Sequence, residues 1–493
     1  MPLLARCDNS PMAQIIRSLA VFFLLVSWGA RAAEPVTLTV DLRTTVVESF
    51  IGAGVQWDPY EYPPSTEAWK TTLARLDYMR PAFFRVMTGA NYCLGFDTAG
   101  NPRYVWSQGE PAGTDRLTWL FNILDYAQAR KIDVMLGEWS PPRGLGGIAG
   151  PQDPRWARII TDFVNYLTTQ KKYSVIKYYN LMNEPNGGWM WPGSKVDYDA
   201  WATGIRNLRA EFDAHGLKGL PIAGPDNSGN WDWLDRCSRE FPDHFGAWEM
   251  HWYARDSDVL DGKIEALLRE KSGVLKENDA KFASKRRFMG EAGMIEGKTN
   301  GDQQPRVKTF PYGVLMADYF AQVARAGWMG AIAWDLDDAL HAVSGRHRPN
   351  PPDDITLKIW GFWNTQGSAM GNPQDEALRP WFYTWSLMGR LFPKGSRIVE
   401  VKGGENVRGL RAIAAAAPFS VMIVNDSDEP RTVLVRAPDA GQKDLLTYRY
   451  FDQERPADKD GYPLPAATLP KADLKTGVKV DLPSRGVVFL TSL

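Results

Sequence analysis

Two glutamates stand in short motifs that suit acid–base chemistry. Glu184 follows Asn183 and precedes Pro185, whereas Glu291 lies far along the chain in a Gly-Glu-Ala-Gly run. Two carboxyl groups about 5–5.5 Å apart can cleave a glycosidic bond with retention, because one protonates the leaving oxygen while the other attacks the anomeric carbon. Only the fold can bring two residues so distant in sequence to that separation.

Strand-length and helix-length apolar patterns alternate over most of the chain. The expected strands cover Ile51–Gln56, Ala82–Met87, Ile132–Glu138, Val175–Met182, Leu220–Ala223, Ala247–Tyr253, Arg287–Glu291 and Gly330–Trp334. The expected helices cover Thr66–Tyr78, Leu117–Ala129, Arg155–Thr168, Tyr198–Ala214, Trp231–Glu240, Lys263–Lys276, Tyr312–Ala326 and Pro380–Leu391. This alternation predicts an α/β fold, a closed (β/α)₈ TIM barrel rather than an open sheet.

Short strands separated by Gly, Pro, Asn and Asp follow Pro393 and predict a C-terminal antiparallel β-sandwich. They cover Val399–Val401, Leu410–Ile413, Ser420–Val424, Thr432–Arg436, Leu446–Phe451, Val478–Leu482 and Val487–Leu490. The alternating run Val36–Val40 has no helix after it, so we expect residues 33–48 to join the sandwich. The expected organisation is a signal peptide over 1–32, the barrel over 49–394 and the sandwich over 395–493.

The active site of such a barrel is built at the C-terminal ends of its strands. Glu184 and Glu291 end the fourth and seventh expected strands, which face each other across the barrel. Strict alternation along a strand would turn Asn183 and Glu184 to opposite faces. We therefore expect the fourth strand to curl at its end.

The motif Asn183-Glu184-Pro185-Asn186, with Glu291 ending the seventh strand, resembles glycoside hydrolase clan A, and most closely families 39 and 30. The likeness covers the order of the barrel elements and short motifs. It implies a retaining glycosidase that cleaves β-linked glycosides or polysaccharides. By the same resemblance Glu184 is the acid/base, Glu291 is the nucleophile, and Asn183 binds the sugar 2-hydroxyl.

Further residues at strand ends resemble the same clan. Arg85 resembles the arginine that supports the nucleophile, and Trp334 resembles the tryptophan that forms the sugar platform. The run from His251 to Tyr253 resembles the His-x-Tyr motif of the sixth strand. Tyr253 would donate a hydrogen bond to Glu291 and, together with the charge of Arg85, keep it ionised.

Each of these residues also has a structural alternative. Arg85 could form a scaffold ion pair, His251 and Trp334 could be ordinary core side chains, and the two glutamates could form salt bridges. Glu249 shares a strand face with His251, and we expect a buried, paired carboxylate below the site, with a catalytic role as the alternative. Glu138 ends the third strand, where it could bind a sugar hydroxyl or pair with Arg85.

Tryptophans number 20, and several stand at or just after the expected barrel strands. These are Trp57, Trp139, Trp189, Trp191, Trp252, Trp334 and Trp363. Because sugar rings stack their apolar faces on aromatic rings, we expect some of them to line a cleft and others to belong to the core. Trp139 is expected to contact the substrate.

Charge and motifs narrow the possible partners. Lys and Arg total 57 and Asp and Glu total 58, which argues against nucleic acid as the main partner. No phosphate loop, dinucleotide fingerprint or HExxH motif occurs in the required context, so no cofactor and no metal are expected. One acidic cluster could bind calcium but lacks the EF-hand spacing, and substrate contacts or a capped helix start are its expected roles. It consists of Asp335, Asp337, Asp338 and His341.

The N-terminus is typical of an export signal. Basic residues precede the apolar stretch Ser18–Trp28, and the run Ala30–Ala32 offers a cleavage point. We expect a secreted or periplasmic protein without a stable membrane span after cleavage, and an uncleaved anchor or a buried helix is the alternative. Translation could start at Met1 or at Met12.

Two cysteines, Cys93 and Cys237, remain after such cleavage. An exported protein is in a compartment that permits disulfides, so the two could form one bridge. Two cysteines are too few for a disulfide framework, and the core must carry the stability.

Two other functions are compatible with the same residues. A catalytically inactive carbohydrate-binding barrel is one, and the presence of both glutamates argues against it. A transglycosylase that acts on an exported polysaccharide is the other, and it would use every residue named above. The loops that would select the sugar, 189–198 and 341–363, have no readable code.

Overall fold

Eight parallel strands form a closed sheet in the computed structural model, which describes residues 34–90, 94–104, 116–141, 145–187, 196–344 and 355–493. In chain order they are β2 (Gly52–Gln56), β3 (Phe83–Thr88), β6 (Asp133–Glu138), β7 (Ile176–Asn180), β8 (Ala223–Ser228), β9 (Ala247–Ala254), β10 (Arg286–Met294) and β11 (Gly330–Ala333). β11 pairs with β2, and a bridge between Tyr179 and Ile222 joins the β7 and β8 edges. The predicted (β/α)₈ barrel is therefore confirmed.

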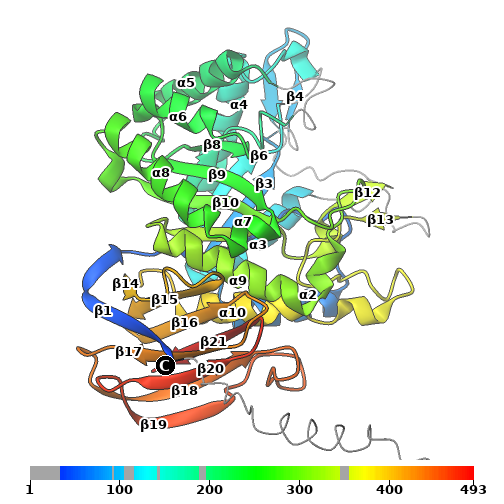
Figure 1. The fold of residues 1–493 in the computed structure, drawn as a ribbon. Helices are drawn as coiled ribbons and strands as arrows, with labels where there is room; N and C mark the ends of the chain where they lie inside the picture. The colour runs from blue at the N-terminus through cyan, green and yellow to red at the C-terminus, as the bar shows by residue number, and fades with distance from the viewer. Residues whose placement is uncertain (1–33, 91–93, 105–115, 142–144, 188–195, 345–354) are drawn as a thin grey trace, which may run out of the picture. The chain divides into compact units, whose positions relative to one another are not determined.

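Helices alternate with these strands and cover the outside of the barrel (Figure 1). They are α2 (Thr66–Met79), α3 (Arg116–Arg130), α4 (Pro154–Asn165), α5 (Tyr198–Ala214), α6 (Asp232–Glu240), α7 (Asp256–Leu260), α8 (Lys263–Asn278), α9 (Phe310–Arg325) and α10 (Pro380–Leu391). In α4, the Asp153 side chain caps the first turn and Pro154 takes the first helical position. The α4 stripe that includes Trp156, Ile160 and Phe163 is fully buried, as its helical period predicts.

A layer of apolar side chains closes the lower end of the barrel. It consists of Ile51, Phe83, Met135, Ala223, Ala247, Phe288 and Ile332, all buried. Phe83, Ala223 and Ala247 are the first residues of their strands, so this layer lies toward the N-terminal ends. Polar residues at the opposite ends of the strands therefore stand above a closed floor.

The fifth barrel strand lies later in the chain than the sequence pattern indicates. β8 begins at Ala223, where the expected strand ends, and continues to Ser228. Its sequence contains Gly224 and Pro225, which are typical of turns rather than of strands. The expected position was wrong because neighbouring strands hold this segment in the sheet against its local preference. The shift brings Asp226 into the barrel.

A second sheet of nine strands combines one strand before the barrel with eight strands after it (Figure 1). Its strands are β1 (Val36–Val47), β14 (Ile398–Lys402), β15 (Leu410–Ala416), β16 (Phe419–Asn425), β17 (Arg431–Arg436), β18 (Gln442–Tyr450), β19 (Ala467–Asp473), β20 (Val478–Leu482) and β21 (Gly486–Thr491). β1 lies between β14 and β17, and it pairs with β17 in parallel, while the other pairings described for this sheet are antiparallel. The predicted sandwich is confirmed, with β19 as a strand that the sequence pattern did not indicate.

Residues 36–493 form one compact unit, so the domain boundaries drawn from the sequence stay a prediction. Four short strands lie outside the two main sheets: β4 (Leu94–Phe96), β5 (Pro102–Tyr104), β12 (Ala342–Ser344) and β13 (Thr356–Leu357). Among the helices that the structure describes, none has the length and apolar character needed to span a bilayer. The expected signal peptide, Cys93, Trp189 and Trp191 lie outside the described residues, and Cys237 is a buried free thiol.

Candidate active site

The chain turns out of strand geometry just after β7, at the position of Glu184. Its φ of 38° lies in the left-handed region that residues other than glycine rarely adopt. The Glu184 backbone N–H donates to Asp226 Oδ1 at 3.2 Å, and the Asn183 N–H donates to the Glu138 carbonyl at 2.8 Å. These contacts hold the curl that the sequence pattern required, so Asn183 and Glu184 reach the same site.

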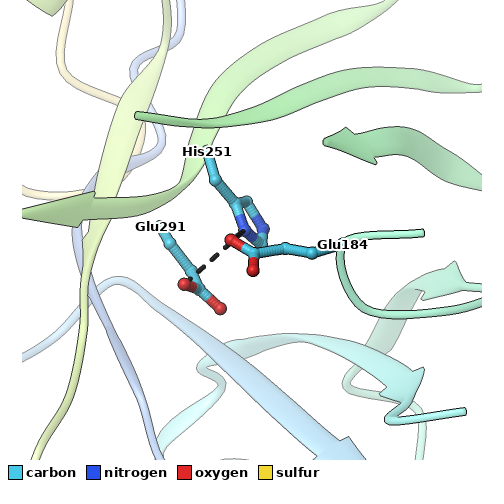
Figure 2. A group of neighbouring side chains, drawn as sticks. All are labelled: Glu184, His251 and Glu291. Carbon is cyan, nitrogen blue, oxygen red and sulfur yellow. Dashed lines mark hydrogen bonds and ion pairs between the residues drawn. The ribbon is translucent and has the colours of Figure 1, made fainter. Parts of the chain in front are cut away.

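Glu184 and Glu291 meet beside His251, which belongs to β9 (Figure 2). The Nδ1 atom of His251 lies 2.8 Å from Glu184 Oε1 and 3.5 Å from Glu291 Oε2. One carboxylate oxygen of each glutamate and one nitrogen of His251 all lie within 4.8 Å of one another. The fold therefore brings together the two carboxyl groups that are far apart in sequence.

Arg85 on β3 joins four of the surrounding side chains. Its guanidinium donates to Glu291 Oε1 at 2.6 Å and to Asn183 Oδ1 at 2.7 Å. It also donates to both oxygens of Asp226, at 3.0 and 3.2 Å, and to Gln56 Oε1. Burial disfavours its charge, but the carboxylates of Asp226 and Glu291 raise the pKa of Arg85 above its ordinary value. Arg85 thus contacts the candidate nucleophile and also forms a buried ion pair with Asp226.

Tyr253 lies on the same face of β9 as His251 and donates to Glu291 Oε2 at 2.5 Å. Burial raises the pKa of Glu291 to about 7, while the charges of His251 and Arg85 and this hydrogen bond act to lower it. The two glutamates keep exposed fractions of 7% for Glu184 and 3% for Glu291, whereas Arg85 and His251 keep none. The glutamates are therefore the charged groups at this point that reach the surface of the site.

Several solved structures are similar to this chain over most of its length. A GH30 endoxylanase from Clostridium papyrosolvens C71 has a TM-score of 0.63 at 12% identity, with 93% of this chain and 100% of that one covered. A GH39 enzyme from Xanthomonas axonopodis pv. citri has a TM-score of 0.62 at 16% identity, with 95% and 99% covered. A monomeric beta-xylosidase from Caulobacter crescentus CB15 has a TM-score of 0.57 at 15% identity, with 93% and 99% covered. The chain therefore shares the fold of these glycoside hydrolase structures. No protein-family model and no curated protein matches the sequence.

Aromatic residues gather at the end of β11. Trp334 is 5% exposed and stacks on His341, with ring centroids 5.0 Å apart and an interplanar angle of 14°. Half-buried Trp139 lies edge-on to both rings. Trp57 and Trp363 are fully buried, so these two belong to the core and do not line a cleft. Trp252 is half-buried.

Two further carboxylates lie below His251 in the barrel. The Nε2 atom of His251 is 3.1 Å from Asp226 Oδ1 and 3.1 Å from Glu249 Oε1. Glu249 is fully buried and takes the place of a paired carboxylate beneath the site. The sequence pattern did not indicate Asp226 as a site residue. The run Pro225-Asp226-Asn227 is typical of a turn, and no other signal marks Asp226.

Glu138 ends β6 without contacting Arg85. Its carboxylate accepts the Ala90 backbone N–H and the Tyr179 hydroxyl. Burial raises the pKa of Glu138 to about 8. The pairing with Arg85 considered from the sequence was wrong, because these two donors hold the carboxylate elsewhere. The side chain has no exposed surface, so it does not face a sugar either.

Two of the acidic residues after β11, Asp337 and Asp338, are engaged with other parts of the protein. Asp337 Oδ1 accepts the Ala339 N–H and so caps the short helix Asp338–Leu340 (η8), one of the roles expected for this cluster. Asp338 forms an ion pair with Arg379. Asp335 is fully buried and has no hydrogen-bond partner among the described residues, and burial raises its pKa well above the ordinary value.

Two sets of side chains in the described part of the chain have ligand atoms close enough to hold a metal ion. They are Glu184, His251 and Glu291, and below them Asp226, Glu249 and His251. Carboxylate and imidazole together suit divalent transition metals. However, the guanidinium of Arg85 already donates to one member of each set and places a fixed positive charge beside both. That charge opposes a cation at either position.

Proposed function

We propose that the chain is a retaining glycosidase that acts on β-linked glycosides or polysaccharides, with Glu184 as acid/base and Glu291 as nucleophile. The observation that carries the proposal is the distance between one carboxylate oxygen of each residue, which is within 4.8 Å. Retaining glycosidases hold the two carboxyl groups about 5–5.5 Å apart, whereas inverting enzymes keep roughly 6.5–9.5 Å to admit a water. The similar structures described as an endoxylanase and a beta-xylosidase also support a β-linked substrate.

The reaction proceeds in two displacements at the anomeric carbon. Protonated Glu184 gives its proton to the glycosidic oxygen while a carboxylate oxygen of Glu291 bonds to that carbon, which releases an alcohol and leaves an α-linked glycosyl ester. Glu184, now a carboxylate, then takes a proton from water. The water oxygen attacks the same carbon, breaks the ester bond and returns Glu291 as a carboxylate, with the sugar again in the β configuration.

The surrounding groups support this chemistry by holding the nucleophile and the sugar. Arg85 and Tyr253 each donate to one oxygen of Glu291, so the carboxylate is fixed before the substrate arrives. Because the Oδ1 atom of Asn183 accepts from Arg85, its amide hydrogens are left to donate to the sugar 2-hydroxyl. Trp334 and Trp139 supply aromatic surface for the sugar ring at the end of β11.

A panel of aryl β-glycosides and polysaccharides, followed by ¹H NMR, tests the proposal on secreted or periplasmic protein isolated after export. We expect turnover with the β anomer formed first. An α anomer formed first would contradict retention. Sugar binding without turnover across the panel would favour the inactive binding barrel, and transfer to an added alcohol in place of water would favour the transglycosylase.

A further inference from the structure

Both ring nitrogens of His251 face carboxyl oxygens. Nδ1 faces Glu184 and Glu291 on the substrate side. Nε2 faces Asp226 and Glu249 on the floor side, toward the N-terminal ends of the strands, and lies 3.1 Å from one oxygen of each. A neutral imidazole carries one N–H donor and one bare acceptor nitrogen. The bare nitrogen would then point its lone pair at carboxylate oxygens, which is unfavourable in a fully buried position. An imidazolium carries an N–H on both nitrogens and a positive charge beside both pairs of carboxyl groups, which removes the conflict.

Room for the floor-side carboxylate depends on a glycine. Gly290 precedes Glu291 on β10, and a Cβ built at that position would lie 1.6 Å from Glu249 Oε1. A side chain at position 290 and the carboxylate at position 249 therefore exclude each other. The sequence that carries the candidate nucleophile also makes the space for Glu249.

Asp226 holds three parts of the site together. Its carboxylate accepts hydrogen bonds from the guanidinium of Arg85 and from the backbone N–H of Glu184. It also forms an ion pair with His251. Burial disfavours its charge, but Arg85 and His251 lower the pKa of Asp226 to about 2. Burial and the charge of Asp226 raise the pKa of Glu249 to about 7. Of the two floor carboxyls, Asp226 is thus the one that stays ionised.

The protonation of His251 depends on the same charged neighbours. Burial disfavours its protonation, but the carboxylates of Glu291, Asp226 and Glu249 raise the pKa of His251 well above its ordinary value, while Arg85 opposes them. With Glu184 and Glu249 protonated, the positive charges of Arg85 and His251 balance the negative charges of Asp226 and Glu291. The buried cluster is then electrically neutral.

We propose that Asp226 and Glu249 form a floor-side carboxylate pair that holds His251 as an imidazolium throughout the reaction, with Asp226 as the ionised member. His251 then donates from Nδ1 to Glu184 and leaves the other oxygen of that carboxyl to face the leaving group. This inference rests on the proposed function for its catalytic consequence but not for the charge state. Asp226 and Glu249 are positioning residues, since both act through His251.

The charge state of His251 is read directly from its imidazole nitrogens by long-range ¹H–¹⁵N NMR of the protein. An H251Q variant assigns the signals. In the native protein we expect both nitrogens of His251 to stay protonated from pH 5 to 9. D226N keeps an oxygen acceptor for the Glu184 N–H but removes the charge, so His251 should become neutral within that range. E249Q imitates a protonated Glu249, so His251 should remain an imidazolium.

Kinetics supply the second readout. In D226N the loss of positive charge beside Glu291 raises the pKa of this nucleophile, so the acid limb of kcat/KM should move to higher pH by roughly one unit, and kcat/KM should fall about ten- to hundredfold. E249Q should lower kcat/KM less than D226N does, because it leaves the charge of Asp226 in place. D318N is the matched control: it removes another buried carboxylate, which pairs with Arg411 away from the site, and should leave the acid limb in place.

The proposal is overturned if native His251 is neutral at pH 7, or if D226N keeps both the imidazolium and the acid limb. Should D226N fail to fold, the titration of native protein and of E249Q still decides the charge state. An imidazolium in a protein that turns over no glycoside would contradict the proposed function alone, and a neutral His251 in an active glycosidase would contradict this inference alone.

Discussion

At the scale of the residue, the ionisation of Glu291 is the property on which the proposed chemistry depends. Burial raises its pKa to about 7, and a raised pKa means that the carboxylate is lost as the pH falls through that value. The activity should therefore have an acid limb near neutral pH, above the range of an exposed glutamate. Activity that stays flat from acid to neutral pH on a poor leaving group would contradict the assignment.

Tyr253→Phe tests a hydrogen bond that counteracts the effect of burial on the pKa of Glu291. Tyr253 donates to Glu291 and so lowers the pKa of Glu291, and its removal should move the acid limb of kcat/KM upward by roughly one pH unit. Tyr319→Phe is the control, because it removes a buried tyrosine hydroxyl that donates to the Trp252 carbonyl instead. A limb that moves equally in both variants would show that the hydrogen bond to Glu291 is not the cause.

Azide rescue separates the roles of the two glutamates. In Glu184→Ala, an activated aryl β-glycoside should still form the ester on Glu291, and azide that enters from the side of Glu184 should give a β-glycosyl azide. In Glu291→Ala, azide should displace the leaving group directly from the opposite face and give an α-glycosyl azide. The products are distinguished by NMR. If both variants gave the same anomer, the assignment of Glu184 and Glu291 would be wrong. It would also be wrong if azide rescued Glu249→Ala and did not rescue one of these two variants.

At the scale of the element, β10 has to pass Glu249 closely, and Gly290 makes this possible. In Gly290→Ala the new Cβ would lie 1.6 Å from Glu249 Oε1, so either the strand or the carboxylate must move. We expect the free energy of unfolding to fall by about 1–3 kcal/mol, measured by urea denaturation, together with loss of activity. Adding Glu249→Ala should recover part of the stability, because it removes the atoms that collide.

Gly273→Ala is the control for that substitution. Gly273 lies inside α8, and a Cβ there meets nothing within 4 Å. Alanine is favoured over glycine in a helix interior, so this variant should gain roughly 0.5–1 kcal/mol. If Gly290→Ala left the free energy of unfolding as high as Gly273→Ala does, the inferred close contact between β10 and Glu249 would be contradicted.

At the scale of the whole molecule, a buried ion pair links a barrel helix to the second sheet. Arg411 on β15 lies 2.7 Å from Asp318 on α9, and Asp318 has no exposed surface. Arg411→Met leaves a buried carboxylate without its partner and should lower the free energy of unfolding by about 3–5 kcal/mol. The exposed pair of Arg408 and Asp261 is the comparison, since Arg408→Ala should cost less than about 1 kcal/mol. Equal losses in the two variants would contradict the buried contact.

The pH dependence of stability reports on Glu138. Its pKa is raised to about 8 in the folded protein, so between about pH 4.3, where an unfolded glutamate titrates, and pH 8 only the folded state keeps this proton. The contribution of Glu138 to stability is therefore full below that window and is lost as the pH rises through it. Urea unfolding at pH 5 and pH 8 should show a smaller difference for Glu138→Gln than for the native protein. Glu405→Gln, at an exposed position, should leave the difference unchanged.

Local sequence patterns were enough to predict the order of the elements and the pair of glutamates. Helical and strand periods are local properties, so α5 and α10 have the bounds that the pattern predicts. The barrel rule then places the residues that end the strands at one rim, which is why Glu184 and Glu291 could be paired without knowledge of their separation.

The contacts among the side chains at the strand ends could not be predicted from the sequence, because they depend on the tertiary structure. The turn-like segment that contains Asp226 becomes a strand because its neighbours supply the hydrogen bonds, and this places Asp226 under His251. From the sequence, Glu138 could bind a sugar hydroxyl or pair with Arg85, but the Tyr179 hydroxyl from the adjacent strand donates to it instead. Which charges meet in a buried cluster depends on distances between elements, and local sequence patterns do not contain those distances.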